Sequence, residues 1–289
     1  MRVCSAVVLV LVGVGMGVGL ACGDSGGSGG SRDAGTGGPP SDKAWVRFGN
    51  LSPDAPVIDI CVSPMNAGQW GTPMLASSGQ QGGLTFPAMS RETYIDAGWL
   101  DFRAVAAGAA DCSTPVGQDL TAQQLNPHGT YTITAVGLLT PGTTSAGPYR
   151  LQQYIEHQEP PAAGKARLRV LNVSPNSPPL WDGVVLDGGV WGTQLTEAEM
   201  GFRMFASGTG IVDGYQDIDP APALPLTIRA TRPQDTPDLY TAPIDLRPGA
   251  ITAVWVIGLV GGTGDQRLGY FVCDETPPDA GGQTACKRQ

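Results

Sequence analysis

The sequence predicts an all-β protein built from two tandem β-sandwich domains, of immunoglobulin-like or transthyretin-like type. Three observations point to this class. Short apolar runs alternate with polar residues, as half-buried strands do. Gly (42) and Pro (25) account for 67 of the 289 residues, which favours turns over long helices. The chain also repeats itself, because the segment that begins at residue 44 returns from residue 166.

The composition narrows the function classes. Apolar residues make up 41% of the chain, which is enough for a core and excludes global disorder. There are 17 Lys and Arg against 26 Asp and Glu, a formal net charge of −9. This acidic balance lacks the positive footprint of nucleic-acid-binding proteins, so we expect no nucleic-acid partner.

Residues 1–21 have the order of parts of a secretory signal peptide. Arg2 supplies a positive charge, and residues 3–20 are almost wholly apolar. The alternative is a retained membrane helix, since the run is about long enough to span a bilayer. Its regularly spaced glycines weaken a helix, and no charged stop-transfer cluster follows, so we favour cleavage.

The junction Leu20-Ala21-Cys22, where the predicted signal ends, resembles a bacterial lipobox. The resemblance implies that Cys22 is acylated, with palmitate-type chains, and becomes the mature N-terminus. Residues 22–43 are rich in Gly and Ser and are predicted to form a flexible tether. We therefore expect a protein anchored to the membrane by its N-terminal lipid, in the cell envelope and at the outer membrane. Whether it faces the periplasm or the cell surface is left open.

Residues 44–155 are predicted to form the first domain. A Ser-Pro-Asp-Ala-Pro turn ends its first strand, because proline lacks the N–H that a ladder needs. The expected strands are 45–51, 57–62, 92–97, 100–106, 130–138 and 150–155. Residues 156–165, which contain Pro160-Pro161, are predicted to link this domain to the next.

Residues 166–275 are predicted to form the second domain, and residues 276–289 a C-terminal tail. The expected strands are 168–173, 183–186, 202–205, 224–231, 251–260 and 267–273. One short helix candidate covers residues 195–200. The opening motif repeats residue by residue at an offset of 122: Arg47, Asn50, Ser52, Pro53 and Pro56 return as Arg169, Asn172, Ser174, Pro175 and Pro178.

Two motifs carry a resemblance to a known family. Residues 50–59 read Asn-Leu-Ser-Pro-Asp-Ala-Pro-Val-Ile-Asp, and residues 130–138 read Thr-Tyr-Thr-Ile-Thr-Ala-Val-Gly-Leu. In these motifs the chain resembles the DUF4397 family. The resemblance implies an exported bacterial β-domain of unknown function, often in tandem behind a lipoprotein signal, and it carries over no catalytic residue. The second copy keeps the opening motif but has Trp181 where the first has Asp59.

Four cysteines remain after the signal region, namely Cys61, Cys112, Cys273 and Cys286. Four cysteines allow three pairings. We favour Cys61–Cys112 with Cys273–Cys286, because each pair then lies within one structural unit and closes a loop across candidate strand ends. Free thiols are the alternative, and they are disfavoured in an oxidising compartment. A structural zinc site is also disfavoured, because the chain has no C-x-x-C spacing and only two histidines.

The candidates for chemistry are few. His128 lies in a predicted turn and His157 in the predicted linker, so both are expected to be solvated loop residues. The best metal candidates are Asp213, Asp217 and Asp219, which crowd one loop and offer the oxygen ligands that Ca²⁺ takes. A solvated acidic loop is the alternative and is favoured. We therefore expect no enzyme activity, no catalytic residue and no cofactor.

Two roles are considered for the tryptophans, packing in the core and binding of a ligand. Trp70 and Trp191 recur before Gly-Thr in both copies, which favours a packing role. Unmatched aromatics such as Trp99 are candidates for a glycan or peptide surface. The resulting hypothesis is a non-catalytic binding or adhesion module with an envelope protein or glycan as partner. The alternatives are a structural envelope scaffold without a specific ligand and a hydrolase acting on glycans or peptides.

Overall fold

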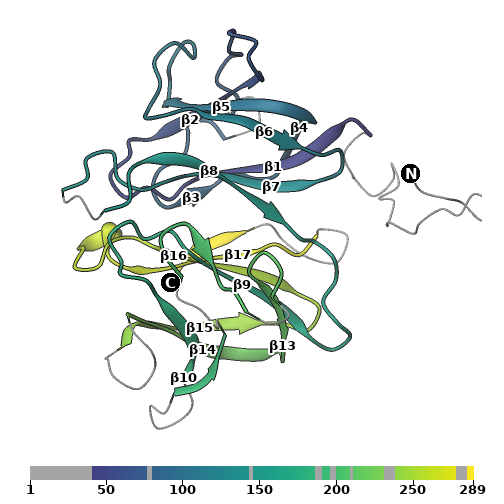
Figure 1. Cartoon of the computed structure of the whole chain (residues 1–289), viewed down its shortest axis with the longest axis vertical. Helices are drawn as coiled ribbons and strands as arrows, with labels where there is room; N and C mark the ends of the chain where they lie inside the picture. The colour runs from purple at the N-terminus through teal and green to yellow at the C-terminus, as the bar shows by residue number, and fades with distance from the viewer. Residues whose placement is uncertain are drawn as a thin grey trace, which may run out of the picture.

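The strands lie in four layers, two from each half of the chain (Figure 1). The computed structural model describes residues 41–76, 80–142, 146–185, 191–195, 200–208, 211–230, 238–277 and 285–289. From the top of Figure 1 downward, the layers are the outer sheet and inner sheet of the first half, then the inner sheet and outer sheet of the second half. We call the contact between the two inner sheets the seam. The all-β sandwich class predicted from the sequence is confirmed.

In the first half, the inner sheet is built around β1. Its strands are β1 (Lys43–Asn50), β3 (Ala88–Met89), β4 (Thr93–Asp96), β7 (Thr130–Val136) and β8 (Arg150–Glu156). Strand β1 pairs antiparallel with β3 and β4 and parallel with β7, which pairs antiparallel with β8. The outer sheet is antiparallel and consists of β2 (Ile58–Pro64), β5 (Gly98–Ala106) and β6 (Leu120–Leu125).

The second half repeats this topology. Its inner sheet consists of β9 (Ala166–Asn172), β12 (Met204–Phe205), β13 (Tyr215–Ile218), β16 (Ile251–Ile257), β17 (Gly269–Asp274) and β18 (Cys286–Arg288). Strand β9 takes the place of β1, with β12 and β13 antiparallel on one side and β16 parallel on the other. The outer sheet consists of β10 (Trp181–Val185), β11 (Trp191–Gln194), β14 (Ala221–Arg229) and β15 (Asp238–Leu246).

Each half has its own apolar core between its two sheets. In the first half, Val46 and Phe48 of β1 meet Ile60 of β2 and Phe102 of β5, all fully buried. In the second half, side chains of β9 and β16 meet those of β14 and β15 in the same way. Because strand side chains alternate, the residues between these core positions on β1 and β9 point to the seam.

Several elements differ from the sequence prediction. Strands β6, β13 and β15 were not expected, because their sequences carry polar residues or proline within the run. Strand β15 contains Pro243, which is tolerated because β15 is the edge of its sheet. The predicted C-terminal tail is wrong in part, since residues 286–288 form β18 on β17. Glu156 belongs to β8 and is buried, so the connection between the halves begins at His157.

Other predictions concern residues that are not described. The signal peptide, Cys22 and the tether up to residue 40 lie outside the described residues, as do residues 196–199 of the helix candidate. The described helical element is the short 3-10 turn Gly264–Gln266. Across the described ranges, no helix has the length and apolar character needed to cross a membrane.

Candidate functional site

The seam is apolar at its centre. Tyr154 of β8 meets Trp255 of β16 edge to face, with ring centroids 5.1 Å apart and Trp255 fully buried. Apolar side chains from both inner sheets surround them: Leu51, Val136, Leu171, Val173, Ala253, Ile257, Phe271 and Cys273. An apolar contact of this kind between the two sandwiches holds them as one body, as in the core of a domain.

A buried ionic cluster lies beside this apolar centre. Arg47 of β1 donates from Nη2 to Oε1 of Glu156 at 2.7 Å and to Oε1 of Glu275 at 2.8 Å. The three side chains have no exposed surface. Burial opposes the charge on Arg47, but the carboxylates of Glu156 and Glu275 raise its pKa. Since Glu156 ends β8 and Glu275 follows β17, a single guanidinium binds both halves.

Arg169 occupies the position of Arg47 in the second half, but its neighbours are mainly aromatic. Its guanidinium lies 4.7 Å from the ring centroid of Tyr215 and donates to the Tyr215 hydroxyl at 3.2 Å. That hydroxyl donates in turn to Oε2 of Glu275 at 2.6 Å. Burial and the negative charge of Glu156 raise the pKa of Glu275, against the opposing effect of Arg47 and Arg169. The two arginines are thus joined through Glu275 and Tyr215.

The repeated opening motif has a structural role in each half. The Asn50 side chain accepts from the backbone N–H of Ser52 and donates to the carbonyl of Leu84. The hydroxyl of Ser52 donates to the carbonyl of Gly137 at 2.7 Å. Asn172 and Ser174 make the equivalent contacts, with the Ser174 hydroxyl donating to Gly258 at 2.8 Å.

Gly137 and Gly258 also need to be glycine for a common reason. Both have positive φ, +90° and +80°, which other residues adopt at a cost. A Cβ would lie 2.2 Å from the carbonyl oxygen of Pro148 in the first case and 2.1 Å from that of Arg267 in the second. Both copies therefore have glycine at this position because the turn requires it.

Each of the two proline turns also contacts the opposite half. The N–H of Gly147, between β7 and β8, donates to the carbonyl of Pro175 at 2.7 Å. In the mirrored contact, the side-chain amide of Gln266 donates to the carbonyl of Pro53 at 2.8 Å. The Pro53–Pro56 turn thus makes part of the seam.

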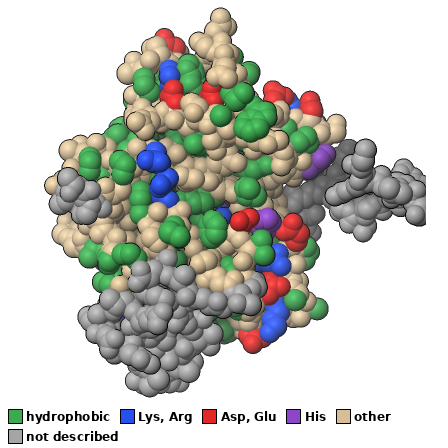
Figure 2. Space-filling model, viewed as in Figure 1, with side chains coloured by type: hydrophobic (Ala, Val, Ile, Leu, Met, Phe, Trp, Pro, Cys, Tyr) green, Lys and Arg blue, Asp and Glu red, His purple; other side chains and the backbone are tan. Residues whose placement is uncertain are grey.

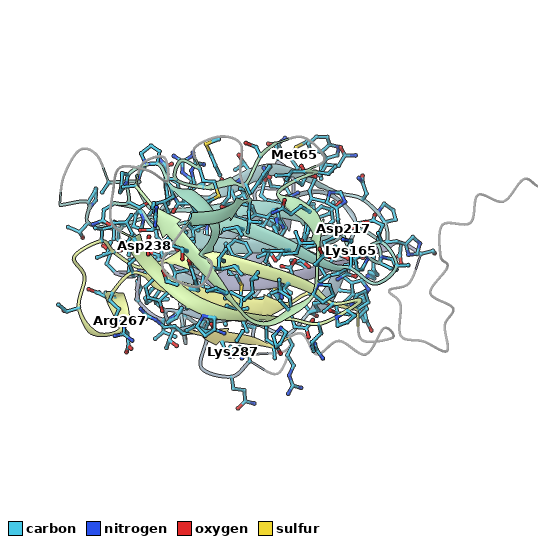
Figure 3. The ribbon with its side chains drawn as sticks, turned by 90° about the horizontal axis from the view of Figure 1, so that it is seen from below. Met65, Lys165, Asp217, Asp238, Arg267 and Lys287 are labelled. Carbon is cyan, nitrogen blue, oxygen red and sulfur yellow. A yellow bond between two sulfur atoms is a disulfide. The ribbon has the colours of Figure 1, made fainter. Side chains whose placement is uncertain are left out.

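The three carboxylates considered as calcium ligands each contact a different basic side chain. Asp213 accepts from His157 at 2.6 Å, Asp217 from Arg167 at 2.7 Å and Asp219 from Lys165 at 2.6 Å. Burial favours neutral Asp217, yet the hydrogen bond from Arg167 lowers its pKa. Asp217 and Lys165 lie on the same side of the molecule (Figure 3). Within the described ranges, no group of three or more His, Cys, Asp or Glu side chains is placed to hold a metal.

The two histidines differ from each other. His128 is exposed in a turn with φ of +62°, as expected. His157 lies in a loop as predicted, but it is less solvated than expected, because its side chain is only 29% exposed and lies between Asp213 and the ring of Tyr215. Contacts with residues that are distant in the sequence, rather than any local pattern, partly cover this ring.

The cysteines are joined as favoured from the sequence. Cys61 of β2 is bonded to Cys112 in the segment between β5 and β6, and Cys273 is bonded to Cys286 between β17 and β18. The second bridge lies at the seam, where Nη1 of Arg47 is 3.9 Å from the sulfur of Cys286.

No known family model matches the chain, and no curated protein matches it.

The side chain of Trp70 packs against Arg103, whereas that of Trp99 is exposed. Trp70 lies beneath the guanidinium of Arg103, 4.2 Å from the ring centroid, and Asp119 binds that guanidinium through both carboxylate oxygens. Trp99 on β5 is 51% exposed, and Met65, whose N–H donates to the carbonyl of Trp99, is 38% exposed. The side chains of Trp181 and Trp191 lie outside what the structure describes.

A hollow of about 460 Å³ also lies on the surface of the second half, next to the Cys273–Cys286 bridge. Two acids and two bases line it, Asp245 and Asp274 with Arg247 and Lys287. Arg247 is already paired with Asp274 at 2.7 Å, so the hollow has little net charge to direct a ligand. Figure 3 shows Lys287 at the edge of the molecule opposite Met65.

Proposed function

We propose that this protein is an exported, lipid-anchored component of the cell envelope that acts as a non-catalytic binding or adhesion module. The signal-like residues 1–21, Cys22 and the Gly- and Ser-rich segment after it support export and anchoring. The two disulfides are compatible with an oxidising compartment. The resemblance to the DUF4397 family supports the same location.

One observation carries the binding role. Trp99 is exposed on the outer sheet of the first half, while its neighbours Leu100 and Phe102 point into the core. A half-exposed tryptophan beside an exposed methionine is costly to leave in water and offers a flat face for a sugar ring or an apolar side chain. This face is the layer farthest from the second half (Figure 1).

The binding role is tested by titrating the purified protein with a panel of soluble glycans and peptides from cell envelopes. We expect at least one class to bind and Trp99→Ala to abolish that binding. Tyr94→Ala is a matched control, because Tyr94 is equally exposed at 51% but lies on the inner sheet. Equal binding by Trp99→Ala and the wild type, or no ligand at all, would favour the scaffold alternative.

The location is tested separately by adding protease to intact cells, with lysed cells as the control. Digestion in intact cells would support display at the surface and contact with external glycans or neighbouring cells. Protection until lysis would instead direct the search to partners in the periplasm. Recovery of the whole protein in a lipid-free soluble fraction would contradict the anchored role.

A further inference from the structure

Strand β8 runs along the seam from an open end to a buried end. Its register with β7 directs Arg150, Gln152, Tyr154 and Glu156 to the second half, since they pair with Val136, Thr134, Thr132 and Thr130. Tyr154 and Glu156 are buried, whereas Arg150 and Gln152 are only partly buried. The seam therefore opens to solvent at the start of β8. Figure 2 shows basic side chains close together near the level where the two halves meet.

The second half contributes Arg203 at this opening. Arg203 has a left-handed backbone with φ of +67°, unusual for a residue with a side chain. Its N–H donates to the carbonyl of Asn172, and its Nη1 donates to Oε1 of Gln152 at 2.9 Å. The preceding Phe202 packs against Gly147, where a Cβ would meet the ring at 2.1 Å. Contacts on both sides thus hold Arg203 against β8.

Arg150 and Arg203 are two like charges without a carboxylate. Neither forms an ion pair with any residue that the structure describes. The Nε atoms of both are buried and have no hydrogen-bond partner there. Burial, and then the charge of Arg150, lowers the pKa of Arg203. This contrasts with Arg47, which takes two carboxylates in the same seam.

The fold itself does not require this basic pair. The register of β16 with β17 places Gly269 where the first half has Arg150, since Gly269 pairs with Ile257 and Arg150 with Val136. Phe271 in turn stands where the first half has Gln152. Pro87 stands where the second half has Arg203, because β3 and β12 take the same register on β1 and β9. The basic pair is therefore particular to one end of the seam.

We infer that Arg150 and Arg203 form a binding site for an oxyanion, a carboxylate or a phosphate carried by a ligand that lies across the two halves. Guanidinium groups present paired N–H donors that match the geometry of these anions. The anion would accept from the unused donors of both arginines and neutralise their repulsion. This site is separate from the Trp99 surface, so either proposal can fail without the other.

The test uses purified protein in chloride buffer at constant ionic strength, titrated with inorganic phosphate and with acetate by calorimetry. A third arm uses vesicles with and without a phosphate-headgroup anionic lipid, to distinguish a soluble anion from one carried on a surface. We expect saturable binding of at least one anion. Arg150→Gln and Arg203→Gln should each weaken it about ten- to a hundredfold, the effect of losing a charged hydrogen bond.

Arg91→Gln is the matched control, because Arg91 is exposed in the segment between β3 and β4 and no described contact joins it to Arg150 or Arg203, so it removes the same charge without touching the site. Wild-type affinity in Arg91→Gln with loss in the two seam variants supports the site. Absent binding, or an equal loss in all three variants, overturns it.

If a seam variant does not fold, the site is tested in the wild type by modifying its arginines with phenylglyoxal. Phosphate or acetate must then protect Arg150 and Arg203 but not Arg91. Equal modification with and without anion overturns the site.

Discussion

Arg47 and Arg169 hold the same position in two copies of one fold, yet their charges are balanced in different ways. Arg47 is neutralised by two buried carboxylates, one from each half. Arg169 lies among three aromatic rings, those of Tyr215, Tyr154 and Phe205, and reaches Glu275 only through the Tyr215 hydroxyl. The repeat therefore preserves the placement of a buried cation at the seam, while the partners that compensate it differ between the halves.

The largest effect should come from replacing the two arginines in turn. Arg47→Met leaves Glu156 and Glu275 buried without their shared cation, and we expect a loss of about 3–5 kcal/mol in the free energy of unfolding. Arg169→Met keeps contact with the aromatic rings and removes a charge that is costly to bury, so we expect about 1–2 kcal/mol. Urea unfolding monitored by tryptophan fluorescence measures both. Equal losses would contradict the division of roles.

The two disulfides offer a second comparison. Cys61–Cys112 closes a separation of 51 residues and Cys273–Cys286 one of 13. Chain-entropy arguments then give about 4 kcal/mol for the first bridge and about 3 kcal/mol for the second. Paired Cys→Ala variants, compared by urea unfolding, measure the difference. A larger loss for the shorter loop would indicate that the second bridge acts through the neighbouring Arg47 rather than through loop closure.

The paired serines should behave alike, in contrast to the arginines. Ser52→Ala and Ser174→Ala each leave a buried glycine carbonyl without its donor, and we expect each to cost about 1–3 kcal/mol. The double variant should show the sum of the two losses, because the serines bind different carbonyls and share no partner. A strongly non-additive result in urea unfolding would show that the two turns are coupled through the seam.

The pH dependence of stability tests the raised pKa of Glu275. Its pKa is raised in the folded state, so the folded protein binds a proton that the unfolded chain has released. Stability contributed by this group is therefore present below its ordinary pKa and is lost as pH rises through the higher folded value. Relative to Glu275→Gln, the wild type should lose up to about 1.4 kcal/mol per pH unit in the window that begins near pH 4.5. Urea midpoints across pH 4 to 8 measure this, and parallel curves would contradict it.

The sequence predicted the fold class and the repeat well but not the seam. Residues 45–51 and 168–173 read correctly as strands because alternation and proline turns are local signals. Local signals do not say that the polar side of both strands faces a second sheet, and so Arg47 and Arg169 resemble ordinary outward residues of a sandwich. A usable signal was the recurrence of an arginine in the first strand of each copy with a glutamate at the end of a later strand or directly after it, Glu156 and Glu275.

The parallel pairing of strands also could not be predicted from local sequence patterns. Strand β1 pairs with β7 and β9 with β16 across more than 80 residues, and nothing in either strand specifies the partner. His157 shows the same limit, because Asp213 and Tyr215, from the other half of the chain, partly cover its ring. The candidate role of Trp99 could be predicted from the sequence, because Trp99 is an unmatched tryptophan beside Gly98 at the start of a strand. The structure shows its side chain exposed, as a binding candidate would be.

The central claim is that the seam makes one body of the two sandwiches. Scanning calorimetry of the purified protein tests it most directly. We predict a single unfolding transition whose calorimetric enthalpy equals its van't Hoff enthalpy, because neither half unfolds without exposing the buried cluster around Arg47. Two separate transitions in the wild type, each of about half the total enthalpy, would contradict the claim and return the molecule to two independent sandwiches.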